Sequence, residues 1–215
     1  DSLVHCAGGL AAKAYLRLRH HLTITGQEHL PAQPPFVMVA NHASHLDTAV
    51  LASTLPMRLR DRVHPLAAGD TFFTSPHLAV AATALTNALP VRRSAADRQA
   101  LKQLRERLAK ERCVYILYPE GTRDAGQTLS PFKPGIGLLV AASTVPVVPA
   151  YIQGSAAALP KGKRLPTHAP ITVRLGPSLT FPDASNHRQG WTDVAQQLHA
   201  AVTRLVAHDH PHEDS

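Results

Sequence analysis

The chain has 215 residues, of which 44% are hydrophobic and 17% charged, a composition that excludes an intrinsically disordered protein and fits one folded domain. Its net charge of +7 and pI near 9.8 favour an anionic partner, such as nucleic acid, a phospholipid surface or a phosphorylated substrate. The two cysteines exclude a disulfide-rich scaffold, and their spacing does not indicate a metal site.

The first expected element is a helix over residues 3–21, in which Leu3, Ala7, Leu10 and Ala14 share one face. Cations crowd the end of this helix: Lys13, Arg17, Arg19, His20 and His21. Two interpretations stay open. Cations complement the dipole at a helix C-terminus, and a basic amphipathic helix also lies on anionic membranes.

Strands and helices are expected to alternate along the rest of the chain. Apolar runs predict strands at 22–25, 36–40, 62–67, 114–117, 145–152 and 171–175. Helical periodicity predicts helices at 44–55, 76–87, 94–108, 135–142 and 191–205. This alternation indicates the α/β class, with a single domain built on a mostly buried mixed sheet flanked by helices. We divide the chain into an N-terminal helical segment (1–25), a main domain (26–208) and a polar tail (209–215).

One apolar stretch needs a separate interpretation, because residues 134–160 carry no charge. Pro146 and Pro149 interrupt any helix there, and the glycines weaken it. We therefore expect a buried helix followed by a buried strand, and no membrane span.

A histidine and an aspartate follow the strand at 36–40, in Asn41-His42-Ala43-Ser44-His45-Leu46-Asp47. Random placement would give about 0.65 such His-x-x-x-x-Asp pairs, so the spacing alone is weak. Ser44-x-x-Asp47 also has the form of a capping box, in which Asp47 only stabilises a helix start. On its own this segment favours the structural interpretation.

A second motif favours the catalytic interpretation of His42 and Asp47 over the structural one. Glu120-Gly121-Thr122-Arg123 follows the strand at 114–117, and about 0.0015 copies are expected by chance. Gly121 permits a tight turn, Thr122 offers a hydroxyl, and Arg123 offers a planar fork for phosphate or carboxylate. Lys133 adds positive charge on the next turn. A strand that ends in a glycine turn is where α/β proteins bind ligands.

With these motifs in order, the chain resembles the glycerophospholipid acyltransferase superfamily. Four blocks carry the resemblance: Asn41-His42 with Asp47, Leu89-Pro90-Val91-Arg92-Arg93, Glu120-Gly121-Thr122-Arg123, and Val145-Pro146-Val147-Val148-Pro149. The resemblance spans residues 26–177. It implies a glycerol-3-phosphate acyltransferase-like fold and acyl transfer from a thioester to an alcohol, with no metal and no cofactor.

The resemblance assigns roles to individual residues. His42 is the general base, since a neutral imidazole can take the proton of an attacking hydroxyl near pH 7, and Asp47 orients the imidazole. No acyl-enzyme is expected. The residues expected to bind substrate are Asn41, Arg93, Glu120, Gly121, Thr122, Arg123 and Lys133. Phe72 and Phe73 are candidates for an acyl groove.

The implied donor is a thioester of acyl-carrier protein or of coenzyme A, and the implied acceptor is an anionic lysophospholipid such as 1-acylglycerol-3-phosphate. We expect no nucleic acid partner and a cytoplasmic enzyme, peripheral at the inner membrane face. Two alternatives stay open. The stretch ALTNALPVRR at residues 84–93, with ALPKG at residues 158–162, resembles acyltransferase units fused to acyl-activating enzymes. The start at Asp1 fits a unit excised from such a protein with a non-glycerolipid acceptor. The net charge also fits a non-catalytic basic membrane-binding module.

Overall fold

A mixed sheet forms the centre of the computed structural model, which describes residues 2–68, 89–91, 97–121, 129–160, 162–163 and 165–207. The strands are β1 (Thr23–Thr25), β2 (Phe36–Ala40), β3 (Val63–Ala68), β4 (Leu89–Val91), β5 (Val114–Leu117), β6 (Ser143–Gln153), β7 (Thr172–Leu175) and β8 (Leu179–Phe181). Their order is β1-β7-β6-β2-β5-β3-β4, with β8 paired to β6. The strand pairs are parallel, except that β6 runs antiparallel to β7 and to β8.

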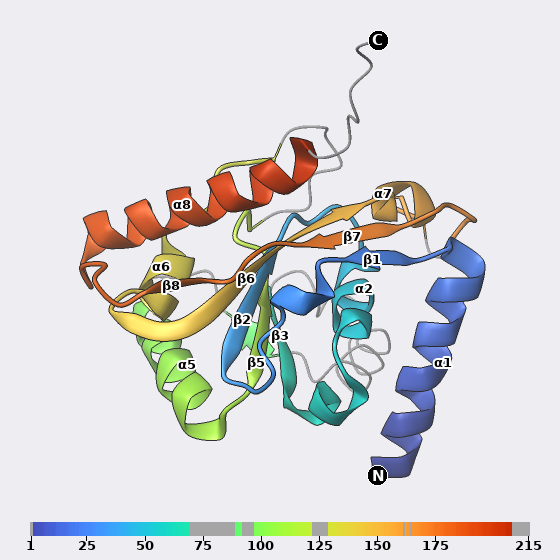
Figure 1. Cartoon of the computed structure of the whole chain (residues 1–215), viewed down its shortest axis with the longest axis horizontal. Helices are drawn as coiled ribbons and strands as arrows, with labels where there is room; N and C mark the ends of the chain where they lie inside the picture. Colours follow the sequence, from blue (N-terminus) through green and yellow to red (C-terminus); the bar gives the residue numbers. More distant parts are fainter. Residues whose placement is uncertain are drawn as a thin grey trace.

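Helices cover both faces of this sheet (Figure 1). The helices are α1 (Ser2–His20), α2 (Asp47–Thr54), α5 (Asp97–Glu111), α6 (Gly135–Val140), α7 (Ser155–Ala158) and α8 (Arg188–Ala207), with short 3-10 helices η1 (Gln27–His29) and η2 (Met57–Arg62). One face packs against α5, α6 and α8, and the other against α1 and α2. The predicted α/β class with a mixed sheet and flanking helices is therefore confirmed.

Strand β2 is the centre of the core, because all five of its residues are completely buried. Side chains alternate along a strand, so Phe36, Met38 and Ala40 enter the core beneath α1 and α2. Val37 and Val39 enter the core beneath α5, α6 and α8. A run of apolar residues without alternation is what a parallel strand buried on both faces requires.

The uncharged stretch at 134–160 folds as predicted, into helix α6 followed by strand β6. None of the helices in the described ranges is long and apolar enough to cross a bilayer. Five observed elements were not expected as such: β4, β8, the single turn α7, and the 3-10 helices η1 and η2. The helix expected at 76–87 and the tail at 209–215 lie outside the described residues.

Helix α1 forms where the sequence predicts a helix, but two residues of its predicted apolar face are turned outward. Among the α1 side chains that the structure describes, Leu16 and His20 are buried, and they pack α1 against the rest of the molecule. Leu10 is 54% exposed, and Ala14 on the same face is exposed as well.

Candidate active site

The two sequence motifs meet at one edge of the sheet. Strand β2 lies between β5 and β6 and is parallel to both, so the carboxyl ends of all three strands point the same way. The turn after β2 carries His42, and the turn after β5 carries Glu120. The carboxyl edge of a parallel sheet is where α/β proteins usually bind ligands.

His42 and Asp47 form a hydrogen-bonded pair at this edge. His42 Nδ1 lies 2.9 Å from Asp47 Oδ2, and the Asp47 side chain is fully buried. The same carboxylate oxygen accepts the backbone N–H groups of Ala43 and Ser44, each at 2.8 Å. An ionised carboxylate can only accept, so Nδ1 donates to it and Nε2 is left as the proton acceptor. The pair has the tautomer that a general base needs.

Asp47 is also the first residue of helix α2, and one of the two hydrogen bonds of the expected capping box is present. Its carboxylate accepts the Ser44 N–H, which is one half of a capping box. The other half is missing, because the Ser44 hydroxyl donates to the Leu159 carbonyl at 3.0 Å and accepts the Leu46 N–H. The helix therefore starts at Asp47 and not at Ser44. Helix capping and orientation of His42 are carried by the same carboxylate oxygen.

Tyr118 forms a wall beside the imidazole. Its ring stacks on that of His42, with centroids 4.1 Å apart and planes tilted by 15°. Its hydroxyl lies 3.2 Å from Thr48 Oγ1, on the residue that follows Asp47. Burial, and secondarily the negative charge of Asp47, raises the pKa of Tyr118 well above its ordinary value. The phenol therefore stays neutral and packs His42 between the β5 turn and helix α2.

Glu120 joins the two turns through backbone groups. One carboxylate oxygen accepts the His42 N–H and the other accepts the Ser130 N–H, both at 2.9 Å. Glu120 is 5% exposed. The carboxylate thus fixes the turn of His42 relative to the segment that leads to Lys133. The direct substrate contact that the resemblance implies for Glu120 stays a prediction.

Lys133 reaches back over Gly121. Gly121 adopts a positive φ of 74°, and a side chain at this position would overlap the ammonium end of Lys133. The Lys133 N–H also donates to the Pro119 carbonyl at 2.9 Å. The structure therefore brings an exposed cation to the first residues of the second motif, as the sequence suggested.

Asn41 is bonded to the backbone of β6, and the substrate contact that the resemblance implies for it stays a prediction. Its amide nitrogen donates to the Ile152 carbonyl at 2.9 Å, and its amide oxygen accepts the Ile152 N–H at 2.8 Å. Both ends of the side chain are thus bonded to β6, where the β2–β6 ladder ends. Asn41 extends strand pairing by one residue and so holds the base of the turn of His42.

Comparison with known proteins agrees with this geometry. The family model described as Acyltransferase matches residues 21–153, which include both turns. The chain belongs to the acyltransferase family.

Relatives in this family are similar in sequence to part of this chain. Human 1-acyl-sn-glycerol-3-phosphate acyltransferase beta is 29% identical over 66% of this chain and 49% of its own length. A chloroplastic 1-acyl-sn-glycerol-3-phosphate acyltransferase of Brassica napus is 32% identical over 65% of this chain and 39% of its own length. The chain thus spans about half the length of the human relative. The crystal structure of the 1-acyl-sn-glycerophosphate acyltransferase of Thermotoga maritima has the same fold, with a TM-score of 0.71 at 19% identity, covering 100% of this chain and 81% of that one.

Several residues that the resemblance implicates cannot be placed relative to the His42–Asp47 pair. They are Phe72, Phe73, Arg93, Thr122 and Arg123, and they lie outside the described residues. The anion-binding arginines and the acyl groove therefore stay predictions.

Tyr118 and Thr48 are site residues that sequence reasoning missed. A signal existed for Tyr118, because it directly precedes Pro119-Glu120-Gly121 at the end of a strand whose carboxyl edge was the expected site. For Thr48 the sequence holds no signal beyond its place after Asp47. Its contact with Tyr118 joins residues 70 positions apart, so no local pattern indicates it.

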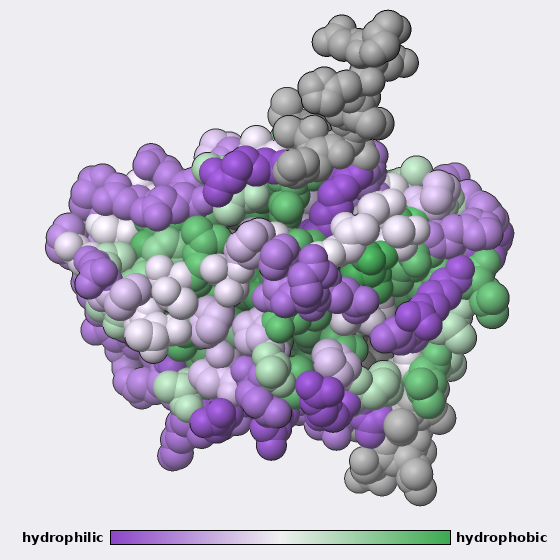
Figure 2. All heavy atoms as spheres, in the orientation of Figure 1, coloured by the Kyte–Doolittle hydropathy of each residue, from purple (hydrophilic) through white to green (hydrophobic). Residues whose placement is uncertain are grey.

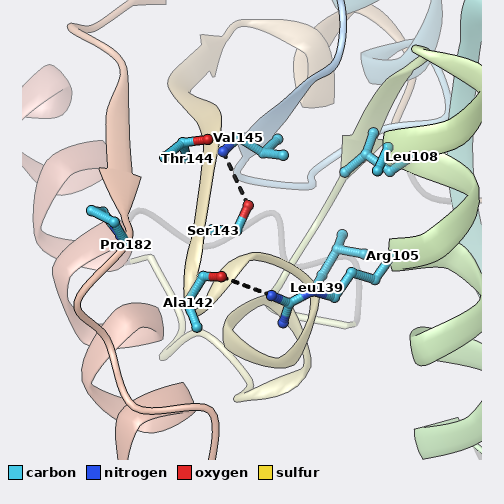
Figure 3. A pocket seen from close by; sticks show the side chains of 9 residues that line it. Arg105, Leu108, Leu139, Ala142, Ser143, Thr144, Val145 and Pro182 are labelled. Carbon is cyan, nitrogen blue, oxygen red and sulfur yellow. Dashed lines mark hydrogen bonds between the residues drawn. The ribbon is translucent and has the colours of Figure 1, made fainter.

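A cavity of about 450 Å³ lies elsewhere, between α5 and the amino end of β6 (Figure 3). Arg105 lines it, and its guanidinium donates to the Leu138 and Ala142 carbonyls, where α6 ends. Cations commonly satisfy the last carbonyls of a helix. The His42–Asp47 pair is at the opposite end of the strands, so this cavity is separate from the candidate active site.

Proposed function

We propose that the chain transfers a fatty acyl group from an acyl thioester to a hydroxyl of a lysophospholipid-type acceptor, such as 1-acylglycerol-3-phosphate. The observation that carries this proposal is the 2.9 Å bond between His42 and a fully buried Asp47. The names of the curated relatives support the lipid acceptor. The donor is a thioester of acyl-carrier protein or coenzyme A.

In the proposed mechanism, His42 Nε2 takes the proton of the acceptor hydroxyl as its oxygen attacks the thioester carbonyl. Asp47 stabilises the imidazolium that forms. The tetrahedral intermediate collapses with cleavage of the C–S bond, and the imidazolium returns the proton to the departing thiolate. The substrate supplies the nucleophile, so no acyl-enzyme forms.

The acceptor's anionic group is proposed to bind beside the second motif. Lys133 supports this role, because its ammonium lies against Gly121 at the site edge. We assign Arg123 and Arg93 to the same task from the resemblance, and orientation of an anionic substrate can contribute several kcal/mol to lowering the barrier. Because the acceptor is a lipid, we infer that the enzyme works at the surface of a membrane, on its cytoplasmic side.

The test is product analysis with purified protein. Acyl-coenzyme A and acyl-carrier protein are each supplied with a panel of alcohols that includes 1-acylglycerol-3-phosphate, other lysophospholipids and non-glycerolipid alcohols. Thiol release is followed optically, and esters are identified by mass spectrometry. We expect a new ester with the lysophospholipid and thiol release that depends on it. Thiol release at the same rate without any acceptor would identify a hydrolase, and no release would leave a binding module.

A further inference from the structure

Helix α8 is seated firmly on the core, although the family model, which ends at residue 153, does not extend to it. Val194, Leu198 and Val202 on its inner face are completely buried. Its backbone comes so close to α6 that a side-chain carbon added at Gly137 would overlap the backbone of Trp191. Figure 2 shows hydrophilic side chains along the outer side of this helix, at the upper left, with hydrophobic atoms beneath them. A side chain that reaches from α8 to a neighbouring segment therefore starts from a fixed point.

His199 connects α8 to the segment that precedes α6. Its Nε2 lies 3.3 Å from the carbonyl oxygen of Leu129. A carbonyl oxygen can only accept, so Nε2 carries a proton and donates it. The imidazole also meets the ring of Phe132 edge to face, with centroids 5.2 Å apart and planes at 88°. One side chain of α8 thus holds residues 129–132 by a polar and an apolar contact.

The peptide group between Leu129 and Ser130 is held from both sides. Its carbonyl accepts from His199, and its N–H donates to Glu120 Oε2 at 2.9 Å. A peptide group is planar and rigid, so the bond on one side constrains the direction of the bond on the other. Donation to the carbonyl also polarises the group and strengthens its N–H as a donor. His199 therefore influences the hydrogen bond that Glu120 receives.

Glu120 passes this constraint to the candidate base. Its other carboxylate oxygen accepts the His42 N–H at 2.9 Å, and the residue is 5% exposed, so water is a poor substitute for a lost protein donor. A line of hydrogen bonds thus runs from α8 through the 129–130 peptide to the turn of His42. It joins segments 70 and 78 positions apart in the sequence, which only the folded sheet and its helices bring together.

The contact at position 199 needs a donor and not only bulk. Phe132 is 8% exposed and belongs to the apolar cluster beneath α8, so an apolar side chain of similar size would also pack against it. The Leu129 carbonyl gains a partner only from an N–H or O–H group. His199 is half-buried at the border of the inner face and supplies both contacts. The packing of α8 explains its ring but not its donated hydrogen bond.

We propose that His199 is a positioning residue for acyl transfer, which acts on His42 through the 129–130 peptide and Glu120. The proposal deepens the function proposed above and rests on it, because its kinetic effect requires His42 to be the base. His199 takes no part in proton transfer. Its role is to give α8 a part in aligning the turn that carries the base.

The kinetic test compares two substitutions at this position. His199→Gln keeps an N–H group near the place of Nε2, and His199→Leu keeps apolar bulk without a donor. We expect kcat to fall by about threefold to tenfold in His199→Leu, the factor that a neutral hydrogen bond is worth, and to stay within about twofold of wild type in His199→Gln. Gln196→Leu, at an exposed position on the same helix, is the matched control and should be unchanged. A Gln variant as slow as the Leu variant would overturn the proposal.

A double-mutant cycle tests the path of the effect. Glu120→Ala removes both backbone contacts that the carboxylate makes. If His199 acts through Glu120, His199→Leu should lower kcat no further in the Glu120→Ala background, with circular dichroism to confirm that each variant is folded. Losses that multiply in the double variant would show that His199 acts by another route, and would overturn the proposal.

Amide hydrogen exchange tests the anchor without any catalysis. The Ser130 N–H should exchange about threefold to tenfold faster in His199→Leu than in wild type or His199→Gln, because the peptide is then held on one side only. Equal exchange in all three proteins would overturn the proposal. If wild type transferred no acyl group, the proposed function would fail, whereas faster exchange in the Leu variant would still support the anchor.

Discussion

Asp47 uses one carboxylate oxygen for three hydrogen bonds. Oδ2 accepts from His42, Ala43 and Ser44, while Oδ1 is buried and has no hydrogen-bond partner within the described ranges. Because of this asymmetry, replacing the Asp47 carboxylate by an amide tests the effect of its negative charge and not the tautomer of His42. In Asp47→Asn, the two backbone N–H groups would hold the amide oxygen in the place of Oδ2. His42 would then keep its tautomer and lose only the negative charge beside it.

We therefore expect Asp47→Asn to fold and to keep the Nδ1–H tautomer. Its kcat should fall by roughly 5–30-fold, because a hydrogen bond to a charged group is stronger than a neutral one by about 1–2 kcal/mol. Imidazole ¹⁵N chemical shifts measure the tautomer, and steady-state kinetics measure kcat. A loss near 10⁴-fold with the other tautomer would show that the backbone bonds do not fix the amide.

Tyr118 is expected to act on His42 through its ring and not through its hydroxyl. Tyr118→Phe keeps the stack and loses the bond to Thr48, so its kcat should stay within about threefold of wild type. Tyr118→Leu removes the stack, and its kcat should fall by about tenfold with little change in KM. Thr48→Val is the matched control for the lost hydroxyl contact. A Phe variant as impaired as the Leu variant would contradict a role for the ring.

At the scale of elements, the site depends on the alignment of two turns. Glu120 holds them together, one backbone N–H on each oxygen. In Glu120→Gln, one of those N–H groups must face an NH₂ group that cannot accept it. We expect kcat to fall by about tenfold, with the unfolding free energy lowered by roughly 1–3 kcal/mol. Kinetics and urea titration measure the two effects, and unchanged kcat would remove Glu120 from the positioning of His42.

Local sequence predicts the elements but not the contacts between them. The five apolar residues of β2 predict its bounds correctly, because a run this short that follows two prolines is typical of a strand buried on both faces. The start of α2 was placed three residues too early, because the Ser44 hydroxyl is directed to Leu159, a residue 115 positions away. No local pattern reports such a distant partner.

The candidate site likewise contains contacts between residues near in the sequence, which can be predicted, and contacts between distant residues, which cannot. The His42–Asp47 pair spans five residues and was predicted from its own motif together with the second one. The contact between His42 and Glu120 spans 78 residues, so only the folded sheet brings the two together. The Asn41 side chain bonds to the backbone of β6, a contact that sequence spacing cannot show.

At the scale of the whole molecule, two tyrosines with raised pKa values are expected to lower stability at alkaline pH. Burial raises the pKa of both Tyr115 and Tyr118 above the ordinary value near 10. Above pH 10 the unfolded chain loses these protons while the folded chain keeps them, so the unfolding free energy must fall as pH rises.

We expect Tyr118 to contribute about 1 kcal/mol of this fall between pH 10 and 11, where the unfolded tyrosine ionises and the folded one does not. Tyr118→Phe should therefore show a shallower decline between pH 10 and 11, measured by urea unfolding followed by circular dichroism. The variant's stability below pH 9 serves as its own reference. An identical slope in wild type and variant would mean that Tyr118 ionises freely in the folded protein.

The account as a whole depends on His42 as the base that activates the acceptor hydroxyl. The most direct measurement compares His42→Ala with His45→Ala, an exposed histidine on the same turn, in thiol release from an acyl thioester with 1-acylglycerol-3-phosphate. We predict a loss of roughly 10²–10⁴-fold in kcat for His42→Ala, and near wild-type turnover for His45→Ala. Turnover by a folded His42→Ala protein close to that of wild type would contradict the account.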